Sequence, residues 1–190
     1  MTRKKIELIL VAFAVIALLA DFVLLVPFGG LLVVIALGCL SLFYFTSGLN
    51  VFSSRPSKGE EATSSDIGFK VENVAGLVFS VVMIGLLFNI QNWPMEAQYL
   101  NFGLAGIGLL LVLIGLKYLR TKTYDAYLLK QGLIYGCLLV ILMVLPPFTL
   151  INIKYRSYPA YREALKRSIQ NPTDTGLRAK VMHEAKKLNN

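Results

Sequence analysis

The chain has 190 residues, and 56% of them are hydrophobic, more than soluble domains usually contain. Together with a mean hydropathy of +0.64, this indicates a membrane protein and leaves no room for an independent soluble catalytic domain. The net charge is +8, and in such a chain a basic excess favours anionic lipid headgroups or an acidic partner over nucleic acid.

Five apolar stretches occupy most of the chain. They are residues 6–26, 31–52, 74–90, 97–116 and 128–151. A helix needs roughly 20 apolar residues to cross a bilayer, and only the third stretch is clearly shorter. The first stretch is too long for a secretory signal and lacks a small-residue cleavage site, so we expect it to stay as a span. The sequence therefore predicts an all-α fold, a polytopic membrane helical bundle of about five transmembrane helices within residues 1–153.

The first four spans form two hairpins, residues 6–52 and 74–116. Each has a short turn with a proline, Pro27 or Pro94, and without Lys or Arg. Superimposing the two prolines aligns the hairpins, which favours duplication of a two-span unit with a fifth span, 128–151, added. The alternative is that any two membrane hairpins look alike. Residues 53–72 between the hairpins have the composition of a water-soluble loop.

Lys and Arg are distributed unevenly among the gaps. Ten lie at the N-terminus and in the gaps after the second and fourth spans, and the two alternate gaps contain none. The positive-inside rule then predicts a cytoplasmic N-terminus. Five spans send the basic C-terminal tail outward, against this rule. The alternative is a fifth segment that does not fully cross, because Pro146 and Pro147 would stop a helix near its end.

The turn of the second hairpin carries a recognisable pattern. Its residues are Gly85, Leu87, Phe88, Ile90, Trp93, Pro94 and Ala97. They resemble the first hairpin of the membrane subunit of the gliding-motility and type IX secretion motor, and of related small Bacteroidota membrane proteins. The motor subunit has a membrane-embedded glutamate in the next helix, whereas residues 97–116 contain no carboxylate. The resemblance thus implies a shared hairpin with its turn outside, and not a motor.

Trp93 and Pro94 are the predicted interface anchor of this hairpin. An indole ring prefers the headgroup level of the bilayer, and a proline prevents the helix from continuing.

Asp21 is the acid that we expect at depth in an apolar span, which makes it a candidate functional residue. It lies close to the Pro27 turn, so we expect its carboxylate to reach water or a neighbouring donor, and Asp21→Asn to leave folding nearly unchanged. Four amides at similar depth are its candidate companions: Asn89, Gln91, Asn92 and Asn101. These five residues form a possible polar membrane site, or simply hydrogen bonds between helices.

Small residues mark the expected helix contacts. Gly132 and Gly136 form a small-xxx-small pattern, and Gly103 and Gly106 belong to a second cluster. Cysteine and histidine give no clustered ligand spacing, since Cys39 and Cys137 lie in separate spans and His183 is in the tail. We therefore predict no metal site and no disulfide.

Residues 154–190 form a predicted basic tail. Nine Lys and Arg against three acids give it a charge of +6. Pro159 and Asp174 suit the starts of two short helices with narrow apolar stripes. Such a short amphipathic C-terminal tail is typical of helices that lie on a membrane surface or dock on a partner.

The sequence contains no nucleophile–base pair, metal spacing or phosphate loop, so we expect no enzyme and no cofactor. We expect a multi-pass protein of the bacterial inner membrane, a structural or assembly subunit of an envelope complex. Its expected partners are the lipid bilayer and other membrane-protein subunits or a second copy, without nucleic acid. The alternative is a small transporter or ion-conducting protein. Because conduction usually requires several ionisable groups at depth, we favour the assembly role.

Overall fold

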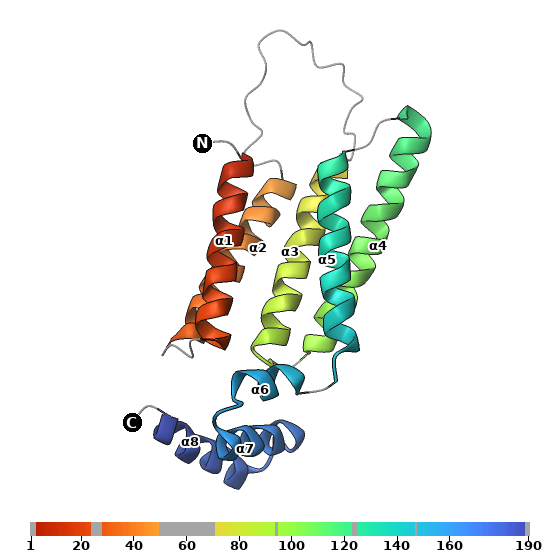
Figure 1. Cartoon of the computed structure of the whole chain (residues 1–190). Helices are drawn as coiled ribbons and strands as arrows, with labels where there is room; N and C mark the ends of the chain where they lie inside the picture. The colour runs from red at the N-terminus through yellow and green to blue at the C-terminus, as the bar shows by residue number, and fades with distance from the viewer. Residues whose placement is uncertain are drawn as a thin grey trace.

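The computed structural model describes residues 3–23, 28–49, 71–93, 95–122, 125–146 and 148–188. These residues form eight helices and no strand: α1 (Arg3–Phe22), α2 (Gly29–Gly48), α3 (Val71–Ile90), α4 (Glu96–Thr121), α5 (Ala126–Val144), α6 (Thr149–Lys154), α7 (Pro159–Gln170) and α8 (Thr175–Leu188). Helices α1 to α5 run alternately up and down, and α6 to α8 lie beyond the end of the bundle that is opposite the start of α1 (Figure 1). The predicted all-helical class is confirmed.

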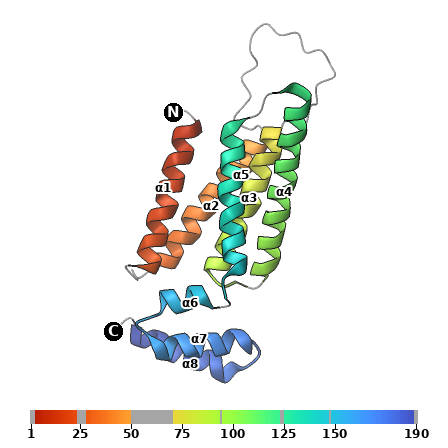
Figure 2. The ribbon, with the colours of Figure 1, turned by 45° about the vertical axis from the view of Figure 1, so that its right-hand side comes forward.

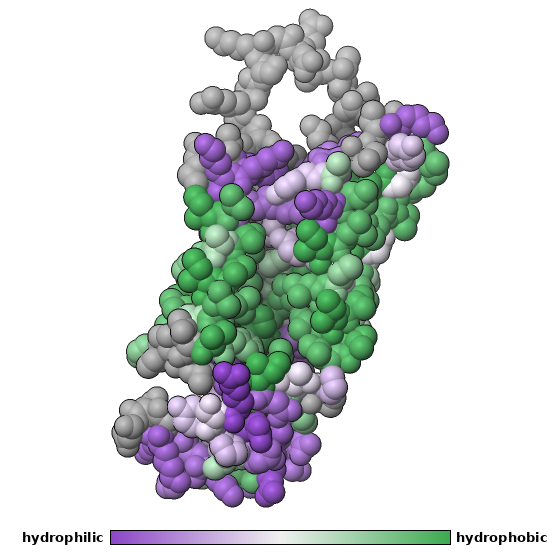
Figure 3. Space-filling view, viewed as in Figure 1, coloured by the Kyte–Doolittle hydropathy of each residue, from purple (hydrophilic) through white to green (hydrophobic). Residues whose placement is uncertain are grey.

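Four of the described helices, α2 to α5, are long and apolar enough to cross a membrane. Twenty residues rise about 30 Å, which matches the hydrocarbon core of a bilayer. The space-filling view shows an apolar belt with polar surface at both ends (Figure 3). Helix α1 has 20 residues and runs beside the others, but it contains five charged residues. A fifth crossing by α1 stays a prediction.

Helix α3 is central, because it packs against α2, α4 and α5 (Figure 2). Its crossing with α2 is close: a Cβ atom added to Gly76 would lie 2.5 Å from the backbone nitrogen of Gly48. On the same two helices, the hydroxyls of Ser41 and Ser80 lie 2.9 Å apart and share a hydrogen bond. Between lipid-embedded helices, close backbone approach and polar contacts replace the hydrophobic driving force.

The last apolar stretch does not form one helix. Helix α5 ends at Val144 rather than at residue 151, and α6 is a separate short helix across the end of the bundle (Figure 1). Leu145 has the extended backbone that is common before a proline. Pro146 follows it, and a left-handed Phe148 starts α6. The predicted fifth span of 128–151 is thus corrected at its C-terminal end.

The two tail helices start at residues suited to that position. Pro159 is in the first turn of α7, and Asp174 precedes α8. The Asp174 carboxylate accepts hydrogen bonds from the backbone nitrogens of Gly176 at 2.8 Å and Leu177 at 3.2 Å, which caps the helix. Helix α6 contacts both α1 and α7, and its Ile151 is buried, so α6 connects the tail to the bundle.

Several predicted features lie outside the described residues. They are Pro27, Pro94, Pro147 and residues 53–70 of the predicted loop.

Candidate functional site

Asp21 is buried and paired rather than hydrated. Only 4% of the residue is exposed, and one carboxylate oxygen lies 2.5 Å from Nζ of Lys154 on α6. A Cβ atom at Gly29 would lie 2.8 Å from the Asp21 Cα, so the glycine lets α2 begin directly beside this acid. Of the two expected partners of this carboxylate, water is therefore wrong and a neighbouring donor is confirmed. The nearby turn does not expose the carboxylate, because α6 folds back over it.

Among the four predicted companions, Gln91 comes nearest to Asp21. Its side-chain amide donates a hydrogen bond of 3.1 Å to the carbonyl of Gly30, at the start of α2. A Cβ atom at Gly30 would lie 3.5 Å from the Gln91 carbonyl oxygen and 3.8 Å from the Asp21 carboxylate. Gln91, just after α3, and Asp21 of α1 thus flank the same glycine.

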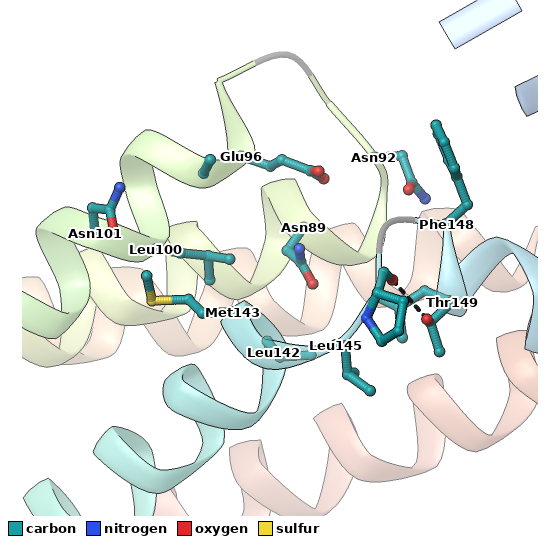
Figure 4. Close-up of a pocket in the computed structure, with 13 residues that line it drawn as sticks. Asn89, Asn92, Glu96, Leu100, Asn101, Leu142, Met143, Leu145, Phe148 and Thr149 are labelled. Carbon is teal, nitrogen blue, oxygen red and sulfur yellow. Dashed lines mark hydrogen bonds between the residues drawn. The ribbon is translucent and has the colours of Figure 1, made fainter. Parts of the chain in front are cut away.

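The other three amides line a separate pocket with Glu96. The pocket has a volume of about 320 Å³ and lies between the α3–α4 turn and the segment that joins α5 to α6. Figure 4 shows the Glu96 side chain extending from the start of α4, with Asn89 and Asn92 on α3 and its turn beside it. Asn101 lies further along α4. The structure thus divides the predicted polar site into an ion pair and a pocket.

Two oxygens at this pocket are buried and have no hydrogen-bond partner among the described residues. They are Oδ1 of Asn89 and Oε2 of Glu96. Asn92 donates a weak hydrogen bond of 3.4 Å to the carbonyl of Ile90, so its donor is partly used within the turn. Because buried polar atoms in proteins are almost always paired, two unpaired acceptors beside one pocket indicate room for a donor.

Trp93 lies at the end of the second predicted hairpin with 40% of its surface exposed. Its ring meets Phe88 edge-on, with the ring centroids 5.1 Å apart, and Phe88 contacts Tyr99 at 4.4 Å. This aromatic group joins the ends of α3 and α4. The position of Pro94 is outside the described residues.

The four predicted packing glycines lie at helix contacts inside the chain. Cβ atoms at Gly103 and Gly106 would lie 3.2 Å from Leu139 and Val78, and one at Gly136 would lie 3.2 Å from Ile107. At Gly132 the nearest atom belongs to Leu111, at 3.6 Å. These glycines therefore face neighbouring helices α3 to α5.

Glu7 is a second buried acid, and sequence reasoning misses it. It is 5% exposed, and its carboxylate accepts hydrogen bonds of 2.7 Å from the hydroxyls of Tyr44 and Tyr127. Gln131 donates to the same carboxylate, and the Tyr135 hydroxyl lies 2.7 Å from that of Tyr44. These five residues, from α1, α2 and α5, are the Glu7 cluster below. Three donors around one carboxylate suit its ionised form.

The sequence of α5 contains a pattern from which the Glu7 cluster could have been predicted. Tyr127, Gln131 and Tyr135 recur every four residues, which puts three polar groups on one face of an apolar helix. Glu7 itself lies near the start of the first apolar stretch, just after a run of basic residues, where a carboxylate is easily assigned to the membrane surface. A stripe of polar side chains on one apolar helix therefore predicts that a polar residue of a neighbouring helix binds them.

No group of three His, Cys, Asp or Glu side chains that could hold a metal ion occurs within the part of the chain that the structure describes. Comparison of the chain with protein-family models, with curated proteins and with solved structures gives no match. The function is therefore inferred from the side chains and surfaces themselves.

Proposed function

We propose that this protein is a structural or assembly subunit of a bacterial envelope complex. It would be a multi-pass protein of the inner membrane, with partners among other membrane-protein subunits or a second copy of itself. The observation that carries the proposal is the docked basic tail. Through α6 and the Lys154–Asp21 ion pair, the tail is held against one end of the bundle, where it forms a surface outside the apolar belt (Figure 3).

The charges of the tail are partly neutralised within it. A hydrogen bond from Lys166 lowers the pKa of Glu163, and one from Lys187 lowers the pKa of Glu184. Both acids therefore stay ionised and paired to a lower pH than usual. Five further cations of the tail are exposed: Arg156, Arg167, Arg178, Lys180 and Lys186. This surface suits an acidic protein partner or anionic headgroups.

Both buried acids of α1 support an assembly role over conduction. The carboxylates of Glu7 and Asp21 each bind donors from other helices of the same chain. Removing one partner of a buried charged group is strongly destabilising, so a change of charge at either carboxylate would disturb the bundle. They are therefore fitted to fix α1 in place rather than to exchange ions with water.

The proposed orientation has the N-terminus in the cytoplasm and the tail outside. The cationic residues in and beside α1, α4 and α5 lie at the end of the bundle where α1 begins, which fits the positive-inside rule (Figure 1). The resemblance of the Trp93 hairpin to the gliding and secretion motor subunit would place the α3–α4 turn outside as well. An envelope complex on the outer face is the partner that fits this arrangement.

A charge reversal on the tail tests the assembly role. The double variant Lys180→Glu/Lys186→Glu should lose most of the partner that co-purifies with the wild type in mild detergent, because both lysines are exposed cations of α8. The matched control Lys180→Arg/Lys186→Arg keeps the charge and should retain the partner. Equal recovery of partners with both double variants would reject the tail as the docking surface.

A small transporter is the second candidate, and the pocket with Asn89 and Glu96 favours it. Its two unpaired acceptors lie near one end of the bundle, as a substrate or cation site would. If this candidate holds, purified protein in liposomes should carry cations or protons across the membrane, and Glu96→Gln should reduce that flux. The same flux in Glu96→Gln liposomes would reject a transport role for the pocket.

A further inference from the structure

The pocket beside Glu96 has one polar and one apolar wall. Asn89, Asn92, Glu96 and Asn101 supply the polar atoms from α3 and α4. The rest of the lining is mainly apolar and comes from α4, α5 and the segment after it. It includes Leu100, Leu142, Met143, Leu145 and Pro146. A volume of about 320 Å³ holds a small organic group and is about tenfold the share of one liquid water molecule.

The polar wall presents acceptors that lack donors. Oε2 of Glu96 and Oδ1 of Asn89 are buried without a partner among the described residues, and the lining of this pocket contains no Lys, Arg or His. A buried carboxylate oxygen without a partner is unfavourable, so a molecule that supplies positively charged donors would gain this free energy on binding. The pocket therefore selects for a cationic donor.

We propose that this pocket binds a primary ammonium group carried on an amphiphilic body, such as an ethanolamine phospholipid. An ammonium group offers three donors and no acceptor, which matches the carboxylate and the neighbouring amide oxygens. A bare metal ion fits less well, because only one lining residue is a carboxylate and half of the pocket is apolar. The apolar wall suits the part of an amphiphile next to its headgroup.

A second cavity extends the site toward the tail. It has a volume of about 610 Å³ and shares three lining residues with the pocket: Asn92, Glu96 and Phe148. Arg178 of α8 lines this second cavity, and guanidinium groups bind phosphates well. Glu96 and Arg178 thus offer opposite charges to a headgroup that carries both an ammonium and a phosphate.

This ligand site does not rest on the assembly role, because none of the tail lysines tested above lines either cavity. The experiment that tests the ligand site also measures tryptophan fluorescence rather than the recovery of a partner. Trp93 is the single tryptophan of the chain and lines the second cavity, so its fluorescence reports a ligand there. Full-length protein in phosphatidylcholine nanodiscs should show a saturable change in Trp93 emission as phosphatidylethanolamine replaces phosphatidylcholine, whose quaternary headgroup has no N–H donor.

Three variants make the test specific. Glu96→Gln should weaken the response to phosphatidylethanolamine at least about tenfold, the loss expected for one charge-assisted hydrogen bond. The control Glu163→Gln removes an exposed acid of α7 and should respond as the wild type. Glu96→Gln should melt at or above the wild-type temperature, because it removes the charge from a half-buried carboxylate with one unpaired oxygen. If Glu96→Gln instead melts below the wild type, Asn89→Ala decides: loss of the response in that variant supports the site, and an unchanged response overturns it.

Free ethanolamine and sodium chloride, each added separately, distinguish a lipid headgroup from a soluble amine and from a metal cation. If free ethanolamine gives the same saturable, Glu96-dependent change, the ammonium assignment stands and the ligand is a soluble amine. If sodium ion alone gives that change, the pocket is a metal-cation site and the proposal is overturned. The absence of any response to phosphatidylethanolamine and ethanolamine, or an unchanged response in Glu96→Gln, would also overturn it.

Discussion

Nζ of Lys154 lies 2.5 Å from a carboxylate oxygen of Asp21, and this ion pair joins the first helix to the short helix after the last apolar one. At the other end of α1, Glu7 is bound by Tyr127 and Gln131 of α5. Along its length α1 packs mainly on α2. Two buried carboxylates, one near each end of α1, thus connect it to the C-terminal part of the bundle.

Asp21→Asn should destabilise the protein, because it leaves the half-buried Lys154 ammonium without its carboxylate. Loss of a charge-assisted hydrogen bond costs about 1.5–3 kcal/mol. Thermal unfolding in mild detergent, followed by circular dichroism, measures the effect against the control Glu163→Gln. The double variant Asp21→Asn/Lys154→Met should recover part of the loss. An unchanged melting temperature in Asp21→Asn would mean that the ion pair does not hold α6.

Tyr44→Phe should destabilise the bundle by about 1–3 kcal/mol, because it removes one donor to the buried Glu7 carboxylate and the partner of the Tyr135 hydroxyl. Tyr158→Phe, at an exposed tyrosine of the tail, is the matched control. The free energy of unfolding, measured by titration with a denaturing detergent, compares the two. Equal values for both variants would remove the Glu7 cluster from the determinants of stability.

The sequence is sufficient to predict the helical class and the approximate positions of α1 to α5, because long apolar stretches with polar ends permit little else in a membrane. Gly103 and Gly136 also reveal packing faces by their spacing alone. The pairing of Asp21 with Lys154 is different. The two residues are 133 positions apart, and the pairing depends on α6 folding back after Pro146. The hydropathy of the sequence does not show that α6 folds back over the end of the bundle.

The same limit applies to the polar pocket. Asn89, Asn92 and Asn101 are recognisable as polar residues in apolar surroundings, but their separation from Asp21 depends on the rotation of α3 and α4 about their axes. Glu96 looks like an ordinary solvated acid of a turn. One of its carboxylate oxygens is buried at the pocket between the α3–α4 turn and the α5–α6 segment, so tertiary packing makes it a candidate site.

Gly76→Ala should be among the most damaging small substitutions in the chain. The new methyl group would lie within 2.5–2.7 Å of backbone atoms of Gly48 and Tyr44, which cannot move as a flexible side chain does. Overpacking of this kind typically costs about 1–3 kcal/mol, and the contact with backbone atoms favours the upper end of that range. Gly108→Ala, where no neighbouring atom lies within 4 Å, should be neutral or stabilising. Equal unfolding free energies would show that α2 and α3 cross less closely.

Cysteine labelling tests the proposed orientation. The exposed Cys39 and Cys137 are first replaced by serine. New cysteines are then introduced at Ser54 and Asn190, one in each variant. If the N-terminus is cytoplasmic and the tail is outside, an impermeant maleimide applied to intact spheroplasts should label Asn190→Cys and leave Ser54→Cys unlabelled until the cells are opened. Equal labelling of the two positions in intact spheroplasts would contradict this orientation.

Truncation separates the tail as a docking surface from α6 as a structural part of the bundle. Deletion of residues 158–190 removes α7 and α8 and keeps Ile151 and Lys154. The remaining bundle should stay folded, since its helices satisfy their own backbone hydrogen bonds and Asp21 keeps its partner. Deletion of residues 152–190 also removes Lys154 and should lower the melting temperature clearly, because the buried Asp21 carboxylate then has no cation.

The shorter deletion should also release the partners of the protein. The tail carries a charge of +6, and salt should weaken the same complex in the full-length protein, because exposed charges are screened within about 8 Å at physiological ionic strength. Co-purification at low and high salt, with the full chain and the 158–190 deletion, compares the two effects. If the truncated protein recovers the same partners in the same amounts, the complex forms through the apolar belt of the bundle and not through the tail.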